Sequence, residues 1–215
     1  LSGCVSDAER VATLLAKHHD GSPNFECKLM VAPAGGAKDI VTRSKLRQAI
    51  DQLFKDRADV ALLHFSGHGT ENNLGGYLVT QDAASYDEGL SMTDLLTLAN
   101  GSRADELVIL LDCCHSGHLG TIPSIDNKAV LREGVSIITA SRCDQPSVEV
   151  DGGGLFTSLV VSALEGGAAD LLGEVTVPAI YAAVEAALGA WDQRPLFKSH
   201  VSKVIALRRC EPPIS

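Results

Sequence analysis

Three segments of the chain are apolar at consecutive positions and stop at polar clusters. Between Asp59 and Ser66 every residue is apolar except His64, and Glu106–Leu111 leads directly into Asp112. Val135–Thr139 is a third run of the same kind. A strand that is covered on both faces has this pattern, because neither set of alternating side chains meets water. The three segments are therefore predicted to be buried strands of a parallel sheet.

Helical spacing of apolar residues separates these strands. The capping-box pattern Ser6–Glu9 opens a predicted helix that runs to about His18. The same periodicity predicts four more helices, at Leu46–Leu53, Ser91–Ala99, Leu155–Leu164 and Pro178–Leu188. Three shorter strands are predicted at Phe25–Val31, Gly75–Asp82 and Lys203–Leu207.

The alternation of strands and helices favours one α/β domain that spans residues 1–215. No linker divides the chain and no internal repeat is present, so we expect a mostly parallel central sheet with helices on both faces. Ligands bind beyond the carboxyl ends of the strands in such sheets. Ser66–Gly69, Asp112–Gly117 and Ser141–Ser147 follow the three buried strands. These clusters are therefore expected to meet at one edge of the sheet.

The composition narrows the class of ligand. The 215 residues are 45% hydrophobic, and 27 acidic against 18 basic residues give a net charge of -9. A protein that binds nucleic acid or anionic lipid usually has an excess of basic residues, which this chain does not have. The acidic excess favours a cationic ligand. No apolar run approaches the roughly 20 residues of a membrane helix. The six cysteines fit reduced thiols better than a disulfide scaffold, so a cytoplasmic location is predicted.

Candidate chemistry lies where the second buried strand ends. Cys113 and Cys114 are adjacent there, and His68 ends the neighbouring strand 46 residues before Cys114. A cysteine acts as a nucleophile when it is a thiolate, which a nearby imidazole promotes. The spacing is close to the roughly 50 residues that separate the histidine and cysteine of caspases. Adjacent strand residues point to opposite faces, so only one of the two thiols can share the imidazole.

These residues carry a family resemblance. Ser66–Gly69 and Asp112–Gly117 resemble the two signature blocks of caspase-like cysteine peptidases, in the metacaspase and bacterial orthocaspase branch. Leu1–Ala8 and Ser141–Ser147 resemble two further blocks of that branch, so the resemblance extends from Leu1 to about Leu207. It implies a caspase-like αβα sandwich. It also implies that the first strand of the family sheet is missing before residue 1.

The resemblance assigns a catalytic dyad. Cys114 would be the nucleophile, and His68 would activate it and protonate the leaving amine. The backbone amides of Gly69 and Cys114 would form the oxyanion hole. Cys113 is then a neighbour of the nucleophile without a catalytic role. The expected activity is that of a cysteine endopeptidase, a regulated bacterial relative of the caspases.

The resemblance also assigns an acidic substrate pocket. Asp7, Ser66 and Asp112 match the positions that bind the side chain before the cleaved bond in metacaspases. A guanidinium between two carboxylates gains charge-assisted hydrogen bonds, whereas an aspartate would meet like charge. Cleavage is expected after Arg, then after Lys. Arg142, the only base within the motifs, lies in the later block and does not argue for the arginine-lined pocket of caspases proper.

No cofactor is expected. Calcium activates many metacaspases, but the spacing of Asp82, Asp87 and Glu88 matches no defensible site, so calcium is kept only as an alternative. Zinc binding is the alternative chemistry for Cys113–His115. Structural zinc sites separate paired ligands by two to four residues, and these adjacent residues do not have that spacing. His64 is interpreted as a core histidine that is satisfied by hydrogen bonds.

The expected partners are proteins or peptides with Arg or Lys before the cleaved bond, and the relatives favour a monomer. Neither nucleic acid nor a membrane is expected. Two alternatives stay open. The chain could be a catalytically silent interaction module with the caspase fold. It could also be a zymogen that is cut in the loop after the nucleophile, where Lys128 and Arg132 are candidate sites.

Overall fold

The central sheet has four strands within the described residues. The computed structural model describes residues 3–31, 40–113, 131–140, 149–150, 153–189 and 195–212. Their sheet order is β1 (Val60–Ser66), β5 (Glu106–Asp112), β6 (Val135–Thr139) and β10 (Leu196–His200). β1, β5 and β6 are parallel, and β10 is antiparallel to β6. The three strands predicted from apolar runs are present, and all residues of β5 and β6 are buried. β1 is half-buried except for the buried Ala61, so its predicted full burial is wrong.

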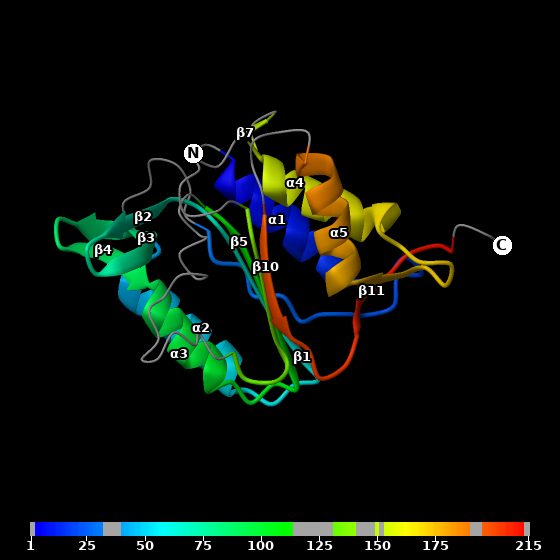
Figure 1. Cartoon of the computed structure of the whole chain (residues 1–215), viewed down its shortest axis with the longest axis horizontal. Helices are drawn as coiled ribbons and strands as arrows, with labels where there is room; N and C mark the ends of the chain where they lie inside the picture. The colour runs from blue at the N-terminus through cyan, green and yellow to red at the C-terminus, as the bar shows by residue number, and fades with distance from the viewer. Residues whose placement is uncertain are drawn as a thin grey trace.

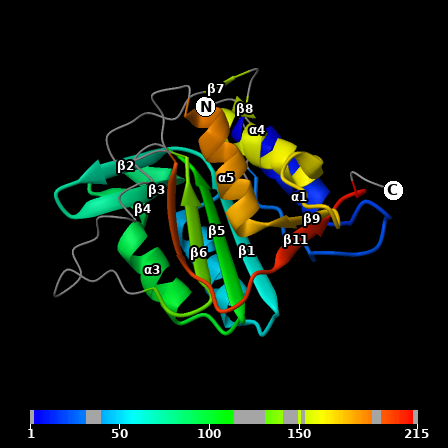
Figure 2. The same cartoon turned by 45° about the vertical axis from the view of Figure 1, so that its right-hand side comes forward.

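Helices cover both faces of this sheet (Figures 1 and 2). α1 (Cys4–Leu15), α4 (Leu155–Ser162) and α5 (Val177–Leu188) lie on one face. α2 (Arg43–Lys55) and α3 (Met92–Asn100) lie on the other. The π-helical segment η2 (Ala163–Gly167) continues α4. The predicted αβα sandwich is confirmed, and no described helix has the length and apolarity to cross a membrane.

The period-two alternation of the strands divides the core into two clusters. Val108 and Leu110 of β5 pack into the cluster beneath α1, α4 and α5. Leu107, Ile109 and Leu111 pack into the cluster beneath α2 and α3. Each face of β5 therefore contributes to a separate apolar core, which is why its sequence shows no polar alternation.

Side-chain caps begin two of the helices where the sequence predicts them. Ser91 accepts from the Asp94 amide at 3.0 Å at the start of α3, and Thr176 accepts from the Ala179 amide at 3.4 Å before α5. The capping box predicted at Ser6 is wrong. α1 begins at Cys4 after Gly3, without a side-chain cap.

The predicted end of the first helix, at about His18, is also wrong. α1 ends at Leu15, because Gly21 (φ 80°) helps the chain to reverse. The amides of Asn24 and Phe25 then donate to the carbonyls of Ala16 and Leu15, both at 3.0 Å. These long-range bonds replace the ones that would continue the helix.

A second, smaller sheet stands beside the first one. It consists of β2 (Gly69–Asn72), β3 (Gly75–Ala84) and β4 (Asp87–Ser91), all antiparallel. The predicted strand Gly75–Asp82 is the major part of β3. Because β2 begins directly after His68, this sheet fixes the chain on the far side of that histidine.

Two shorter ribbons complete the described strands. β9 (Glu174–Thr176) pairs with β11 (Ala206–Arg209), and β7 (Glu149–Val150) pairs with β8 (Gly153–Gly154). The strand predicted at Lys203–Leu207 is therefore displaced: it begins at Ala206 and joins β9 instead of the central sheet.

The strand predicted at Phe25–Val31 is wrong, because these residues form neither a strand nor a ladder. Phe25 instead packs against the core cluster of α1, α4 and α5. β1 pairs with β5 along one edge, and its other edge carries no strand from the part of the chain that the structure describes. β10 was not predicted, because the polar residues Lys198 and Ser199 interrupt its apolar pattern.

Candidate active site

The carboxyl ends of β1 and β5 lie side by side. Ser66 pairs with Asp112 in the parallel ladder, and the Gly67 amide donates to the Asp112 carbonyl at 3.1 Å. A Cβ at Gly67 would lie 2.8 Å from the ring of Phe65, so a side chain there would require that ring to move. His68 follows at the same edge and is exposed. Ser66–His68 and Asp112 thus meet as expected.

The small sheet determines how the chain leaves His68. The Val79 amide donates to the His68 carbonyl at 2.9 Å, and Gly69 is paired with Leu78. His68 and Val79 are the residues next to Gly69 and Leu78. Because these two neighbours are hydrogen-bonded to each other, Gly69 and Leu78 form a non-hydrogen-bonded antiparallel pair. The N–H of Gly69 is therefore directed away from β3.

The two adjacent cysteines differ in how far the structure describes them. Cys113 is 0% exposed and packs with Leu111 in the core beneath α2 and α3. It lies on the face opposite to Asp112, as the period of a strand requires. Cys114 and the cluster Ser141–Ser147 lie outside the described residues.

Asp7 is a buried carboxylate on the first turn of α1. Asp7 is only 1% exposed. Its Oδ2 accepts hydrogen bonds from Ser66 Oγ at 2.9 Å and from the Gly154 amide at 2.9 Å. Its Oδ1 is buried without a hydrogen-bond partner, and Asp7 forms no ion pair with any described residue. Neighbouring Arg10 donates to Ser158 at 3.3 Å. Asp7 therefore keeps an unmet capacity to accept hydrogen bonds.

Asp112 is a second buried carboxylate, 4% exposed, at the end of β5. Its Oδ2 accepts two bonds from Thr157, one from the backbone amide at 3.0 Å and one from the hydroxyl at 2.7 Å. Thr157 is the third residue of α4, whose N-cap residue Gly154 has no side chain to satisfy that amide. Asp112 thus supplies from β5 the cap that α4 lacks, at the helix end that favours negative charge.

Gly154 lies between Asp7 and Asp112, which we call the pocket acids. Its amide donates to Asp7, and a Cβ on it would lie 1.9 Å from Asp112 Oδ2. A Cβ on the preceding Gly153 would lie 2.8 Å from Asp7 Oδ1. The two glycines let the backbone approach both carboxylates, so the pocket acids are held on either side of one short segment.

His64 lies beneath the pocket acids on the same face of β1 as Ser66. Its Nε2 is 3.2 Å from Thr157 Oγ1. Burial lowers the pKa of His64 to about 4, so the imidazole is neutral near pH 7. The expected core histidine is thus linked to Asp112 through Thr157.

Sequence reasoning missed Thr157, Gly153 and Gly154. Thr157 looked like one polar residue within an apolar helix, and the glycines looked like the break before it. The available signal was the run of three glycines, Gly152–Gly154, directly before the helix, since adjacent glycines often permit close backbone approach.

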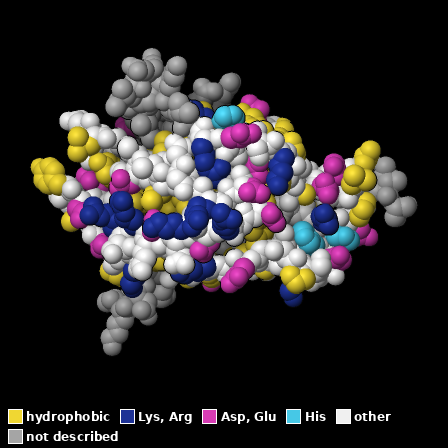
Figure 3. All heavy atoms as spheres, turned by 90° about the horizontal axis from the view of Figure 1, so that it is seen from below, with side chains coloured by type: hydrophobic (Ala, Val, Ile, Leu, Met, Phe, Trp, Pro, Cys, Tyr) yellow, Lys and Arg dark blue, Asp and Glu magenta, His cyan; other side chains and the backbone are white. Residues whose placement is uncertain are grey.

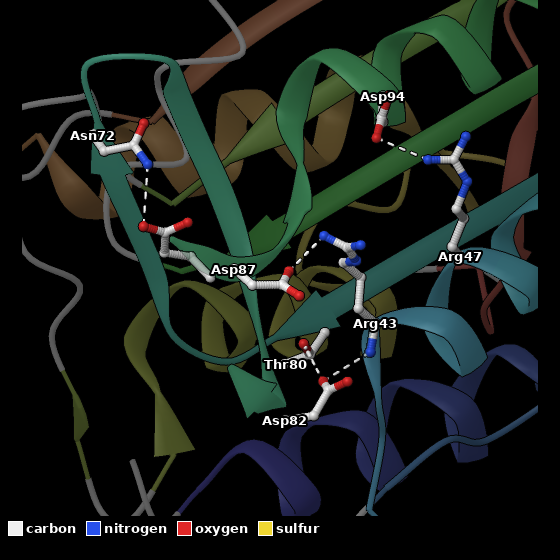
Figure 4. Close-up of polar contacts among 8 residues, drawn as sticks. Arg43, Arg47, Asn72, Thr80, Asp82, Asp87 and Asp94 are labelled. Atoms are coloured by element: carbon white, nitrogen blue, oxygen red, sulfur yellow. Dashed lines mark hydrogen bonds and ion pairs between the residues drawn. The ribbon is translucent and has the colours of Figure 1, made fainter. Parts of the chain in front are cut away.

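The three acids considered for calcium are engaged by neighbouring groups (Figure 4). Asp82 accepts from the Arg43 amide at 2.9 Å, and Asp87 forms an ion pair with the Arg43 guanidinium at 2.5 Å. Glu88 accepts from Asn72 at 3.2 Å. Within the described ranges, no group of three or more His, Cys, Asp or Glu side chains could hold a metal ion.

The surface charge is mixed despite the net charge of -9. Figure 3 shows a band of Lys and Arg side chains with Asp and Glu side chains around it. Arg47 pairs with Asp94 at 2.8 Å, and Lys55 pairs with Asp51 at 2.6 Å.

Metacaspases are among the similar proteins of known family. The chain is 28% identical over 140 residues to metacaspase-3 of Trypanosoma cruzi, which covers 57% of this chain and 37% of that protein. It is 28% identical over 130 residues to metacaspase-6 of Arabidopsis thaliana, covering 55% of this chain and 34% of that protein. The matched regions thus span less than two fifths of these relatives.

Solved structures with the same fold agree. A Geobacter sulfurreducens protein matches with a TM-score of 0.68 and 19% identity, over 100% of this chain and 90% of that one. Caspase-1 of Spodoptera frugiperda matches with a TM-score of 0.66 and 14% identity, over 97% and 84% of the two chains. At these identities the likeness concerns the fold. Finally, the family described as "Caspase domain" matches residues 1–205, so the chain belongs to the caspase-domain family of peptidases.

Proposed function

We propose that the chain is a cysteine endopeptidase that cleaves after Arg, and less readily after Lys, through a dyad of Cys114 and His68. Family membership supports the reaction class. The position of exposed His68 at the end of β1, beside the strand that leads into Cys114, supports the dyad. Its substrates would be proteins or peptides with Arg or Lys before the cleaved bond, and it would act as a monomer in the cytoplasm.

The unmatched Oδ1 of Asp7 is the observation that carries the specificity. Ser66 and Gly154 donate to Oδ2, but a buried carboxylate oxygen without a donor or a cation is costly, and Oδ1 is such an atom. A substrate cation would supply the missing charge. Arg offers planar, bidentate donors that can reach two carboxylates, whereas Lys offers a single ammonium. An aspartate side chain would add a third negative charge beside Asp7 and Asp112.

The proposed reaction proceeds through an acyl-enzyme. His68 takes the proton of the Cys114 thiol, and the thiolate attacks the carbonyl carbon to form a C–S bond. The backbone amides of Gly69 and Cys114 stabilise the oxyanion. The direction of the Gly69 N–H, away from β3, supports this role. The C–N bond breaks as His68 protonates the amine. Water then attacks the thioester carbonyl carbon while His68 accepts one of its protons. The C–S bond breaks, the carboxylic acid product leaves, and His68 returns the proton to the Cys114 thiolate.

Self-processing is the second candidate behaviour, and the structure bears on its site. The Arg132 guanidinium donates to the carbonyls of Glu133 at 2.6 Å and Ala104 at 2.7 Å. Its amide donates to Asn100 Oδ1 at 2.9 Å. Cleavage after Arg132 would require these bonds to break, so Lys128, which lies outside the described residues, is the favoured site for a zymogen.

A panel of fluorogenic peptides tests the proposal. Peptides with Arg, Lys or Asp before the reporter are incubated with the wild type, Cys114→Ala and His68→Ala, and a thiol-reactive probe reports selective labelling of Cys114. We expect the wild type to cleave the Arg peptide fastest, the Lys peptide more slowly and the Asp peptide not at all. Both variants should lose activity. Equal Asp turnover contradicts the specificity. Absent labelling of Cys114 favours the silent interaction module.

A further inference from the structure

A polar chain runs from β1 through α4 to the carboxylate of Asp112. His64 Nε2 lies 3.2 Å from Thr157 Oγ1, and Thr157 Oγ1 donates to Asp112 Oδ2 at 2.7 Å. The Thr157 amide donates to the same oxygen at 3.0 Å. Because a hydroxyl carries only one proton, Thr157 must accept from His64. This arrangement assigns the proton of the neutral imidazole to Nε2.

Neither polar side chain is explained by core packing. Thr157 is 0% exposed in α4, whose other buried residues Phe156, Val160 and Val161 are apolar. A valine would fill nearly the same volume without a hydroxyl to satisfy. His64 is half-buried in β1 between Leu63 and Phe65, and desolvation disfavours its charged form. Polar groups in such places cost stability unless they are bonded, which points to a role at their common end, Asp112.

We propose that Thr157 and His64 are positioning residues that hold the Asp112 carboxylate for the basic side chain of the substrate. This inference rests on the proposed specificity. Thr157 fixes Asp112 Oδ2 with two donors, and His64 fixes the direction of the Thr157 hydroxyl. With one oxygen anchored, the carboxylate plane is set before the substrate arrives, so less ordering accompanies binding.

The two pocket acids differ in which elements of the fold hold them. Asp7 is held by Ser66 and Gly154 at one oxygen, and its other oxygen is unmatched. Asp112 is held through α4. The position of α4 is thereby coupled to the geometry of the pocket, since Thr157 cannot leave Asp112 without the loss of two bonds.

Binding without chemistry tests the role of Thr157. In a Cys114→Ala parent, the Kd of a fluorescein-labelled peptide that contains one Arg is measured by anisotropy. Thr157→Val should raise Kd about tenfold, the effect of one lost hydrogen bond to a charged group. Thr157→Ser keeps the hydroxyl and should stay within about twofold. Thermal unfolding of each variant verifies that it is folded.

The same measurement tests His64. His64→Gln retains an N–H donor and should bind nearly as the parent does. His64→Leu removes the donor and should weaken binding several-fold, by less than Thr157→Val, because its effect passes through Thr157. In the enzyme with Cys114 present, Thr157→Val should raise KM for the Arg peptide and leave kcat within about twofold.

A double-mutant cycle separates positioning from general destabilisation. If Thr157 acts through Asp112, Thr157→Val should add no further loss of affinity in an Asp112→Ala background. A loss of equal size in both backgrounds overturns the inference, as does parent-like binding by Thr157→Val. If the Cys114→Ala parent binds Arg and uncharged peptides equally, the proposed specificity fails and the inference fails with it.

Discussion

Gly154 touches Asp112 so closely that a Cβ on the glycine would lie 1.9 Å from the carboxylate Oδ2. The same residue donates its amide to Asp7 at 2.9 Å. Gly154 has φ -66° and ψ 131°, which any residue can adopt, so the requirement for glycine here comes from space and not from backbone strain. The identity of residue 154 therefore controls the spacing of the two pocket acids.

The variant Gly154→Ala should displace Asp112 or the β8 segment and lower kcat/KM for an Arg peptide by about tenfold or more. The added methyl group cannot fit without movement of a buried charge. Steady-state kinetics with an Arg peptide measures the effect. Gly101→Ala is the control, because its Cβ would meet nothing closer than 3.5 Å. Wild-type kinetics in Gly154→Ala would contradict the described geometry.

Removal of the Asp112 carboxylate should weaken recognition and spare the nucleophile. We expect Asp112→Ala to raise KM for an Arg peptide by about tenfold or more, since a charged hydrogen-bonded partner of the substrate is lost. The rate of alkylation of Cys114 by iodoacetamide should change little. If alkylation also disappears while the protein remains folded, Asp112 supports the dyad itself and not only the pocket.

Protonation of His64 gives the fold a pH dependence. The imidazole of the unfolded chain takes up a proton as the pH falls through 6.5, but His64 in the fold stays neutral until about pH 4. The unfolded state binds more protons in this window, so stability decreases as the pH falls from 6.5 to 4. The full contribution is about 3 kcal/mol.

The variant His64→Gln should remove this part of the pH dependence. Urea unfolding of the wild type and the variant at pH 7, 6, 5 and 4 measures the difference between their free energies of unfolding. That difference should shift in favour of the variant as the pH falls. A difference that is constant across the window would contradict the burial of a neutral imidazole.

Arg132 is expected to support the start of β6. Arg132→Ala should lower the free energy of unfolding by about 1–3 kcal/mol, because the carbonyls of Ala104 and Glu133 lose their donors. Denaturant unfolding measures the change. Mass spectrometry of incubated wild-type protein provides the second test: a fragment that ends at Arg132 would contradict the structural role, whereas one that ends at Lys128 would agree with it.

Local pattern predicted the parts of the fold that are buried on both sides. β5 and β6 are completely buried, so their apolar runs were unambiguous. β10 lies at the sheet edge with Lys198 and Ser199 in its sequence, and only its pairing with β6 makes it a strand. The predicted strand Phe25–Val31 failed for the opposite reason, because suitable residues there have no ladder partner among the described residues.

In the candidate site too, the sequence predicts the residues that belong to motifs and misses those whose role depends on tertiary contacts. The motifs pointed to Asp7, Ser66, His68 and Asp112, and parallel strand order brings the last three to one edge. Thr157 carries no motif, and its role depends on a bond that crosses 45 residues of sequence. Gly154 is likewise defined by what packs against it. Such contacts arise from tertiary structure, which a single sequence does not display.

The most direct measurement compares kcat/KM for two peptides that differ only in Arg against citrulline before the cleaved bond. Citrulline retains the length and planarity of Arg but has no charge. If Asp7 and Asp112 recognise a cation, the Arg peptide should be favoured by a hundredfold or more, because citrulline carries no charge to meet the buried Asp7 Oδ1, which has no hydrogen-bond partner. Equal turnover of the two peptides would contradict recognition of a basic side chain by the pocket acids.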